Sequence, residues 1–112
     1  RKLTVISHSN ALFIVLGLVD KGVELNKLII AGFPPINYDQ TVAETVNLIK
    51  RVNKVRIFQG DEDEYLPSDK LHKLLSSHDI KTNTLATIRS ADHHFKDKES
   101  FLADKIAQFV AK

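Results

Sequence analysis

The segment Leu3-Thr-Val-Ile-Ser-His-Ser-Asn-Ala11 runs directly into the apolar stretch Leu12–Val19. A β-branched segment followed by a helical pattern with no loop between them predicts a sharp strand-to-helix turn with Ser9 at its apex. In such a turn, a nucleophile elbow, the serine is exposed above the end of a parallel sheet beside backbone N–H groups. Ser9 is therefore a candidate nucleophile, although a serine in this position can also serve as the N-cap of the helix.

The composition is that of an ordinary globular protein, with 112 residues, 43% of them hydrophobic, and a formal net charge of +2. Lys and Arg are spread along the chain, so we expect neither nucleic acid nor an anionic membrane as a partner. The absence of cysteine rules out disulfides and thiolate chemistry and favours a reducing compartment, for which we take the cytoplasm. The longest apolar run, Ala11–Val19, is too short to span a bilayer.

Four units of strand followed by helix can be marked along the chain. The expected strands are residues 2–7, 27–31, 54–59 and 81–88, and the expected helices are residues 10–21, 39–51, 68–77 and 98–111. The first helix is apolar nearly all round, which predicts burial on most sides. Ser68 is the expected cap of the third helix. The fourth strand is polar and is expected at a sheet edge.

Strict alternation of strands and helices predicts a single α/β domain over residues 1–112, a three-layer sandwich in which helices flank a parallel sheet. Right-handed crossovers place the carboxyl ends of all the strands along one edge. Four polar loops then share that edge: Ser7–Asn10, Gly32–Tyr38, Gly60–Pro67 and Ser90–Lys96.

Three of these loops carry the groups that a serine hydrolase needs. A serine hydroxyl requires a neighbouring base, and imidazole suits that role because its pKa lies close to neutral pH. A carboxylate on the other ring nitrogen fixes the tautomer and stabilises the imidazolium. The loop after the third strand is rich in carboxylates, and the loop after the fourth contains His93 and His94. The chain order of serine, acid and histidine is the order found on sheets of this type.

The whole chain resembles the C-terminal half of an α/β-hydrolase. The resemblance is carried by Ile6-Ser-His-Ser-Asn-Ala11 at the elbow, Gln59-Gly-Asp-Glu-Asp-Glu-Tyr-Leu-Pro67 at the acid turn, and Ala91-Asp-His-His-Phe95 at the base. The small capless dienelactone-hydrolase-like and carboxylesterase-like branches look most similar. The family patterns select Asp63 as the acid and His93 as the base, whereas Ser7 and Ala11 replace the two glycines of the usual elbow.

The resemblance implies cleavage of an ester or related acyl bond in a small-molecule substrate, through an acyl-enzyme intermediate and without a cofactor or metal. The Asn10 backbone N–H would help to hold the oxyanion, and His8, Phe33, Tyr65 and Leu66, with Pro34, would line an open site. The strands that supply the second oxyanion donor in the family are absent from this sequence. We therefore expect the chain to be the C-terminal part of a longer hydrolase and to be close to inert when isolated.

Several residues have a simpler interpretation. Asp61, Glu62 and Glu64 are expected to form a solvated acidic loop, His72 and His78 to face solvent, and His94 to lie at the surface or in the pocket wall. His8 could line the pocket or only pack against its neighbours. Asp63 and His93 could instead bind a divalent metal, although two ligands are few.

The function has an alternative from another class, namely a non-catalytic α/β binding module, either a degenerate hydrolase half or a flavodoxin-like ligand binder. The first strand also has a free edge in this chain. Such an edge invites association, so we expect it to pair with the missing N-terminal half of the sheet, from the same or a separate chain, or with a second copy.

Overall fold

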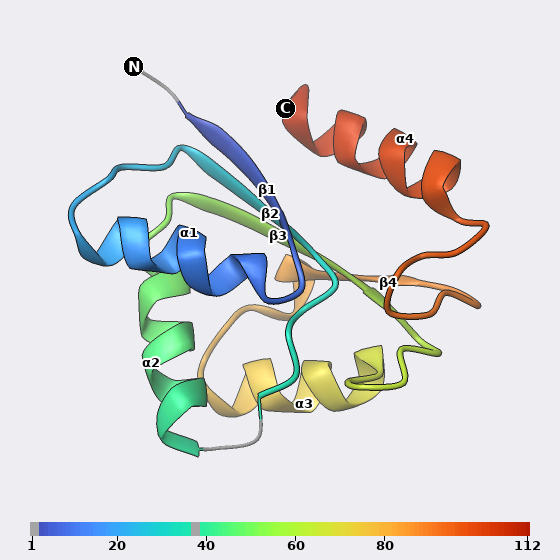
Figure 1. Ribbon diagram of the computed structural model, residues 1–112, viewed down its shortest axis with the longest axis horizontal. Helices are drawn as coiled ribbons and strands as arrows, with labels where there is room; N and C mark the ends of the chain where they lie inside the picture. The colour runs from blue at the N-terminus through green and yellow to red at the C-terminus, as the bar shows by residue number, and fades with distance from the viewer. Residues whose placement is uncertain (1–2, 37–38) are drawn as a thin grey trace.

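The computed structural model describes residues 3–36 and 39–112 and consists of alternating strands and helices (Figure 1). Lys2, expected to open the first strand, and Asn37 and Tyr38, expected in a loop, lie outside the described residues. The strands are β1 (Thr4–His8), β2 (Lys27–Ala31), β3 (Lys54–Gly60) and β4 (Leu85–Ile88). The helices are α1 (Ala11–Asp20), α2 (Asp39–Ile49), α3 (Ser68–Ser77) and α4 (Glu99–Val110).

All four strands are parallel and lie in the order β1-β2-β3-β4. The register pairs His8 with Ala31, Ala31 with Phe58, and Phe58 with Ala86. The carboxyl ends of the strands therefore meet at one edge of the sheet, and the loops that follow them are neighbours. The parallel sheet and the position of β4 at its edge confirm the prediction from the sequence.

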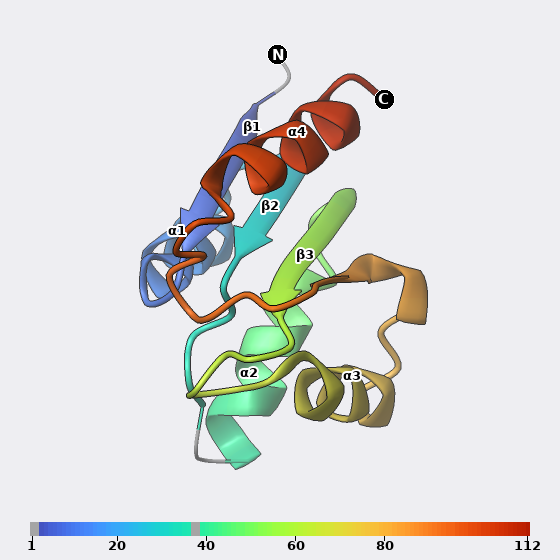
Figure 2. The same ribbon diagram turned by 90° about the vertical axis from the view of Figure 1, so that its right-hand side faces the viewer.

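Alternating side chains of the strands build one hydrophobic core on each face of the sheet. Leu28, Ile30 and Ile57 point to the face covered by α1, α2 and α3, where Leu12, Leu16 and Leu71 join them. Ile29 and Phe58 point to the other face, which α4 covers with Leu102 and Phe109. Figure 2 shows α4 alone on that side of the strands. The three-layer α/β architecture is thus confirmed.

The expectation that α1 is buried on most sides is wrong. Leu12, Leu16 and Val19 recur at helical spacing and are buried, whereas Ile14 is 72% exposed and Leu18 47% exposed. One stripe of the helix packs on the sheet, and no described element covers the opposite stripe. The helix does end as the glycine pattern predicts, because Gly22 follows it with a φ of +99°.

Two further expectations are also wrong in detail. Strand β4 begins only at Leu85, because Thr82–Thr84 form a turn of 3₁₀-helix. Threonine favours strands, but these three residues have no strand partner in the described register. Ser68 does not cap α3, because Pro67 occupies the N-cap position and makes no side-chain hydrogen bond there, while Ser68 is buried in the first turn.

Strand β1 is the second edge of the sheet. Within the described residues it pairs with β2 alone. Ile6, in the middle of this strand, is 56% exposed, and Leu3 just before it is 44% exposed. The described part of the chain contains no helix that is long and apolar enough to cross a membrane.

Candidate active site

Ser9 lies in the turn between β1 and α1, in the backbone conformation that a nucleophile elbow requires. Its φ is +53°, a left-handed value that is uncommon for residues other than glycine. The turn is held by the Ser9 N–H, which donates to the Gly32 carbonyl at 2.8 Å. The N-cap of α1 is Asn10, so the hydroxyl of Ser9 does not cap the helix. The Ser9 side chain is free to make a contact elsewhere.

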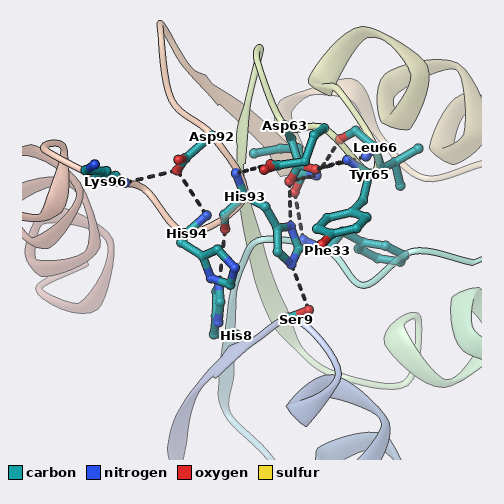
Figure 3. Close-up of polar contacts among 12 residues, drawn as sticks. His8, Ser9, Phe33, Asp63, Tyr65, Leu66, Asp92, His93, His94 and Lys96 are labelled. Atoms are coloured by element: carbon teal, nitrogen blue, oxygen red, sulfur yellow. Dashed lines mark hydrogen bonds and ion pairs between the residues drawn. The ribbon is translucent and has the colours of Figure 1, made fainter.

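That contact is with His93, which the loop after β4 brings to the elbow (Figure 3). The Ser9 hydroxyl lies 2.8 Å from Nε2 of His93, although the two residues are 84 positions apart. The other ring nitrogen, Nδ1, lies 2.7 Å from Oδ2 of Asp63. Because a carboxylate can only accept, Nδ1 carries a hydrogen, and in the neutral ring Nε2 is free to accept the hydroxyl hydrogen of Ser9. This is the proton arrangement that a general base needs.

Asp63 is held in place by four hydrogen bonds. Its side chain is fully buried. Oδ1 accepts from the Tyr65 and Leu66 N–H groups, both at 2.9 Å, and Oδ2 accepts from His93 and from Nε2 of Gln59 at 3.0 Å. The carboxylate therefore has little freedom to turn away from the imidazole.

Gln59, the residue before the glycine of the acid turn, is a part of the site that sequence reasoning missed. Its side chain is completely buried. Besides its bond to Asp63, it donates to the Leu66 carbonyl at 2.6 Å and accepts from the Phe33 N–H at 2.7 Å. It thus ties the loop after β2 to the acid turn. No sequence pattern predicts this role for a glutamine at the end of a strand.

Asp61, Glu62 and Glu64 are all exposed, as predicted for a solvated acidic loop, but two of these carboxylates also make contacts that the sequence did not predict. Oδ1 of Asp61 accepts from the Ser90 N–H at 2.7 Å, and Oε1 of Glu64 accepts from the His93 N–H at 3.0 Å. Both carboxylates therefore hold the loop that carries the histidine.

Backbone N–H groups lower the pKa of Glu64, first its own and then that of His93. Asp92, inside the histidine loop, behaves similarly. Its Oδ1 accepts from the Lys96 N–H at 3.0 Å and the His94 N–H at 3.1 Å, and these bonds, that of Lys96 foremost, lower its pKa. Both groups therefore favour the ionised form that holds the loop.

His8 holds the backbone carbonyl group of His93. Its Nε2 lies 3.1 Å from the carbonyl oxygen of His93, and because a carbonyl can only accept, Nε2 carries the hydrogen. His94 is exposed, with its ring 5.5 Å from that of His8 and 5.2 Å from that of His93. Of the two other histidines, His72 is exposed and His78 is half-buried.

Two glycines allow the loops to approach this closely. A Cβ atom on Gly60 would lie 2.1 Å from the Ala91 carbonyl oxygen, so no other residue fits without a shift of the backbone. Gly32 has a φ of +78°, and a Cβ there would lie 3.2 Å from the His93 carbonyl oxygen. Both approaches involve the backbone of the histidine loop, which therefore depends on these small residues.

The residues expected to line the site divide into two groups. Tyr65 is 59% exposed, with its ring 4.9 Å from that of His93 and edge-on to it, and Leu66 is half-buried. Phe33 and Pro34 are fully buried and belong to the interior rather than to an open wall. Their backbone contributes instead, through the Phe33 N–H.

Asn10 heads α1, next to Ser9. The first N–H groups of a helix have no partner within the helix, so they can receive an anionic oxygen. Among residues 3–36 and 39–112, no group of three or more His, Cys, Asp or Glu side chains could hold a metal ion. The arrangement offers a hydroxyl, a base and a fixed carboxylate in one hydrogen-bonded line.

Comparison of the chain with protein-family models, with curated proteins and with solved structures gives no match in any of the three.

Proposed function

We propose that this chain carries the catalytic triad of an α/β-hydrolase-type serine hydrolase that cleaves an ester or related acyl bond. The observation that carries the proposal is the continuous line of hydrogen bonds from Ser9 through His93 to Asp63. Two contacts of 2.7–2.8 Å on the two nitrogens of one buried imidazole, with the serine in a left-handed elbow, are the arrangement by which such triads are recognised.

The proposed reaction follows from the hydrogens of this line. Ser9 Oγ attacks the acyl carbon as its proton passes to Nε2 of His93, and Asp63 stabilises the imidazolium. The Asn10 N–H donates to the oxyanion of the tetrahedral intermediate. His93 then gives the proton to the leaving alcohol, which leaves an ester on Ser9. Water attacks that ester by the same route, releasing the acid and restoring the serine, without a cofactor.

We propose a small or flexible acyl substrate. Only the residues from Gly32 to Tyr38 separate β2 from α2 in the sequence, so no large lid is encoded there. Tyr65 stands exposed beside His93 and offers an aromatic wall to the acyl or alcohol group. A marked preference for long acyl chains would contradict this part of the proposal. A chain without cysteine suits reducing surroundings, so the cytoplasm is the proposed compartment.

The active form requires a second oxyanion donor, and we propose that it comes with further strands that pair with β1. Strand β1 has a free edge among the described residues, and Ile6 beside that edge and Ile14 on α1 expose large apolar surface. The covering segment would be the N-terminal half of the sheet, from the same or a separate chain, or a second copy. Loss of one oxyanion donor costs a factor of about 100 to 1,000 in turnover, so the 112 residues alone should be nearly inactive.

The incomplete oxyanion hole and the uncovered face of α1 also favour a second candidate function, a binding module derived from a hydrolase half. A fluorophosphonate probe, which reacts with an activated serine, distinguishes the two in the full-length protein. We expect labelling that is lost in Ser9→Ala and retained in Ser77→Ala, a matched change of an exposed serine on α3. A folded full-length protein that takes up no label would favour the binding module.

A further inference from the structure

A groove lies on the face of the sheet that carries α4, apart from the side chains of the triad. In Figure 2, α4 crosses in front of β1 and β2, and β3 lies clear of it to the side. Between α4 and the strands β3 and β4 is a cavity of about 640 Å³. Cavities of roughly 300–1,000 Å³ are the usual size for small-molecule sites.

The charge of the groove differs from that of the chain as a whole. The basic residues that line it are Arg56, Arg89, Lys98, Lys105 and Lys112. Asp97 is the one acidic residue among its described lining residues. The chain as a whole has a net charge of only +2. A concave site with several cations and a single carboxylate attracts anions.

The groove also has aromatic walls, and they hold two of the cations. The Arg56 guanidinium carbon lies 5.0 Å from the centre of the Phe109 ring, and Nζ of Lys105 lies 5.3 Å from that of Phe101. Contacts of this kind fix the charged groups against apolar surface. Phe101 is itself 50% exposed, so aromatic surface remains for a ligand.

Arg56 supplies an independent sign that an acceptor belongs here. Its Nε is buried and has no hydrogen-bond partner among the described residues. Buried donors in folded proteins are almost always satisfied by protein, water or ligand, and an unpaired one requires an explanation. A carboxylate or phosphate in the groove would accept from the terminal nitrogens of the same guanidinium group.

We propose that this groove binds a small amphiphilic anion, a molecule with a carboxylate or phosphate head and an aliphatic or aromatic body. The head would lie against Arg56, and the body against Phe58 and Phe101. A concave site of this volume fits a free small molecule better than a membrane surface or an extended acidic peptide. The site goes beyond the proposed hydrolase function and does not depend on the triad.

Titration of the ¹⁵N-labelled full chain with octanoate tests the proposal, with octanamide as a neutral analogue of the same length and inorganic phosphate as a head group alone. We expect saturable shifts of the amide resonances of Phe101 and Lys105 with octanoate. Arg56→Gln should weaken this binding by about tenfold or more, and Lys105→Gln, which removes a second cation from the groove wall, should also weaken it. Lys73→Gln, a matched change of an exposed cation on α3, should leave it unchanged.

Because Arg56 packs on Phe109, its variant could fail to fold, and Lys105 on α4 then carries the test. If octanamide binds as tightly as octanoate, the proposal that the ligand must be an anion is overturned. If phosphate binds as tightly as octanoate, the proposal that the ligand needs an apolar body is overturned. Shifts at Ile6 and Ile14 in place of the groove, or displacement of octanoate by hexaglutamate at lower concentration, would overturn the assignment. Retained binding in Ser9→Ala would separate this site from the proposed hydrolase, whether or not the latter is active.

Discussion

Replacement of Gln59 by leucine should strongly destabilise the protein. The variant keeps a side chain of similar volume but removes three hydrogen bonds, to the Phe33 N–H, to the Leu66 carbonyl and to the Asp63 carboxylate. The residue is completely buried, so water cannot replace the missing partners. A buried donor or acceptor left unpaired costs about 1–3 kcal/mol.

Three such losses would amount to at most about 3–9 kcal/mol, an upper range because the Asp63 carboxylate keeps its three other hydrogen bonds, and the apolar leucine regains about 2 kcal/mol by burial. The lower half of the remaining range is the more realistic, because the three bonds share one side chain and their losses are not additive. We therefore expect the free energy of unfolding to fall by about 3 kcal/mol. This is a large fraction of the ~5–15 kcal/mol typical of a domain.

Urea unfolding followed by circular dichroism measures this loss directly. Gln108→Leu, the same change at an exposed position on α4, is the control and should shift stability by less than ~0.5 kcal/mol. Gln59→Glu should also be destabilising, because it places a second negative charge beside Asp63, and acidification should relieve the repulsion by protonating the new carboxyl group. A loss below ~1 kcal/mol in Gln59→Leu would refute the idea that this residue holds the acid turn.

Four further predictions concern the loops and the uncovered surface. Under the proposed hydrolase function, Glu64→Ala should lower the kcat of the full-length protein by about 10- to 100-fold because His93 loses its backbone anchor. Glu62→Ala, a matched change two positions away, should leave kcat unchanged; equal effects would contradict the anchoring role. The pKa of Glu64 lies below its ordinary value of 4.5. The contact between the Glu64 carboxylate and the His93 N–H is therefore fully present above pH 4.5 and is lost as the pH falls through the lowered pKa. An NMR titration of the His93 amide resonance would follow this loss. Gly60→Ala should impair folding and reactivity together, measured by thermal unfolding and by probe labelling, since its Cβ meets the Ala91 carbonyl. Ile14→Lys should leave the isolated chain folded and reduce its self-association in sedimentation experiments; an unchanged distribution of species would argue against an interface there.

Much of the fold could be predicted because apolar segments and the glycines that end them alternate regularly along the chain. Strict alternation requires crossovers, crossovers require parallel strands, and parallel strands bring Ser9, Asp63 and His93 to one edge of the sheet. The exposure of Ile14 could not be predicted, because an apolar stripe does not reveal whether a partner covers it. Thr84 favoured a strand by its side chain, but strand pairing begins only at Leu85.

The supports of the site were harder to find than its reactive groups. A motif identifies the acid among Asp61, Glu62, Asp63 and Glu64, but nothing in their order says which of the others turn toward the histidine loop. That choice depends on the backbone positions of Ser90 and His93, which only the folded structure supplies. The role of Gln59 could not be predicted for the same reason, because its three hydrogen-bond partners are distant in the sequence or are backbone atoms.

The separation of Ser9 from His93 along the chain has a consequence for how the protein matures. Their contact joins residues 84 positions apart in the sequence. It cannot form until all four strands have paired and the loop after β4 packs against the turn after β1. The proposed reactivity of Ser9 should consequently be the final property to return on refolding, later than the helical signal or the collapse of the chain. A newly made chain released before its last twenty residues would keep most of its sheet and yet lack its base.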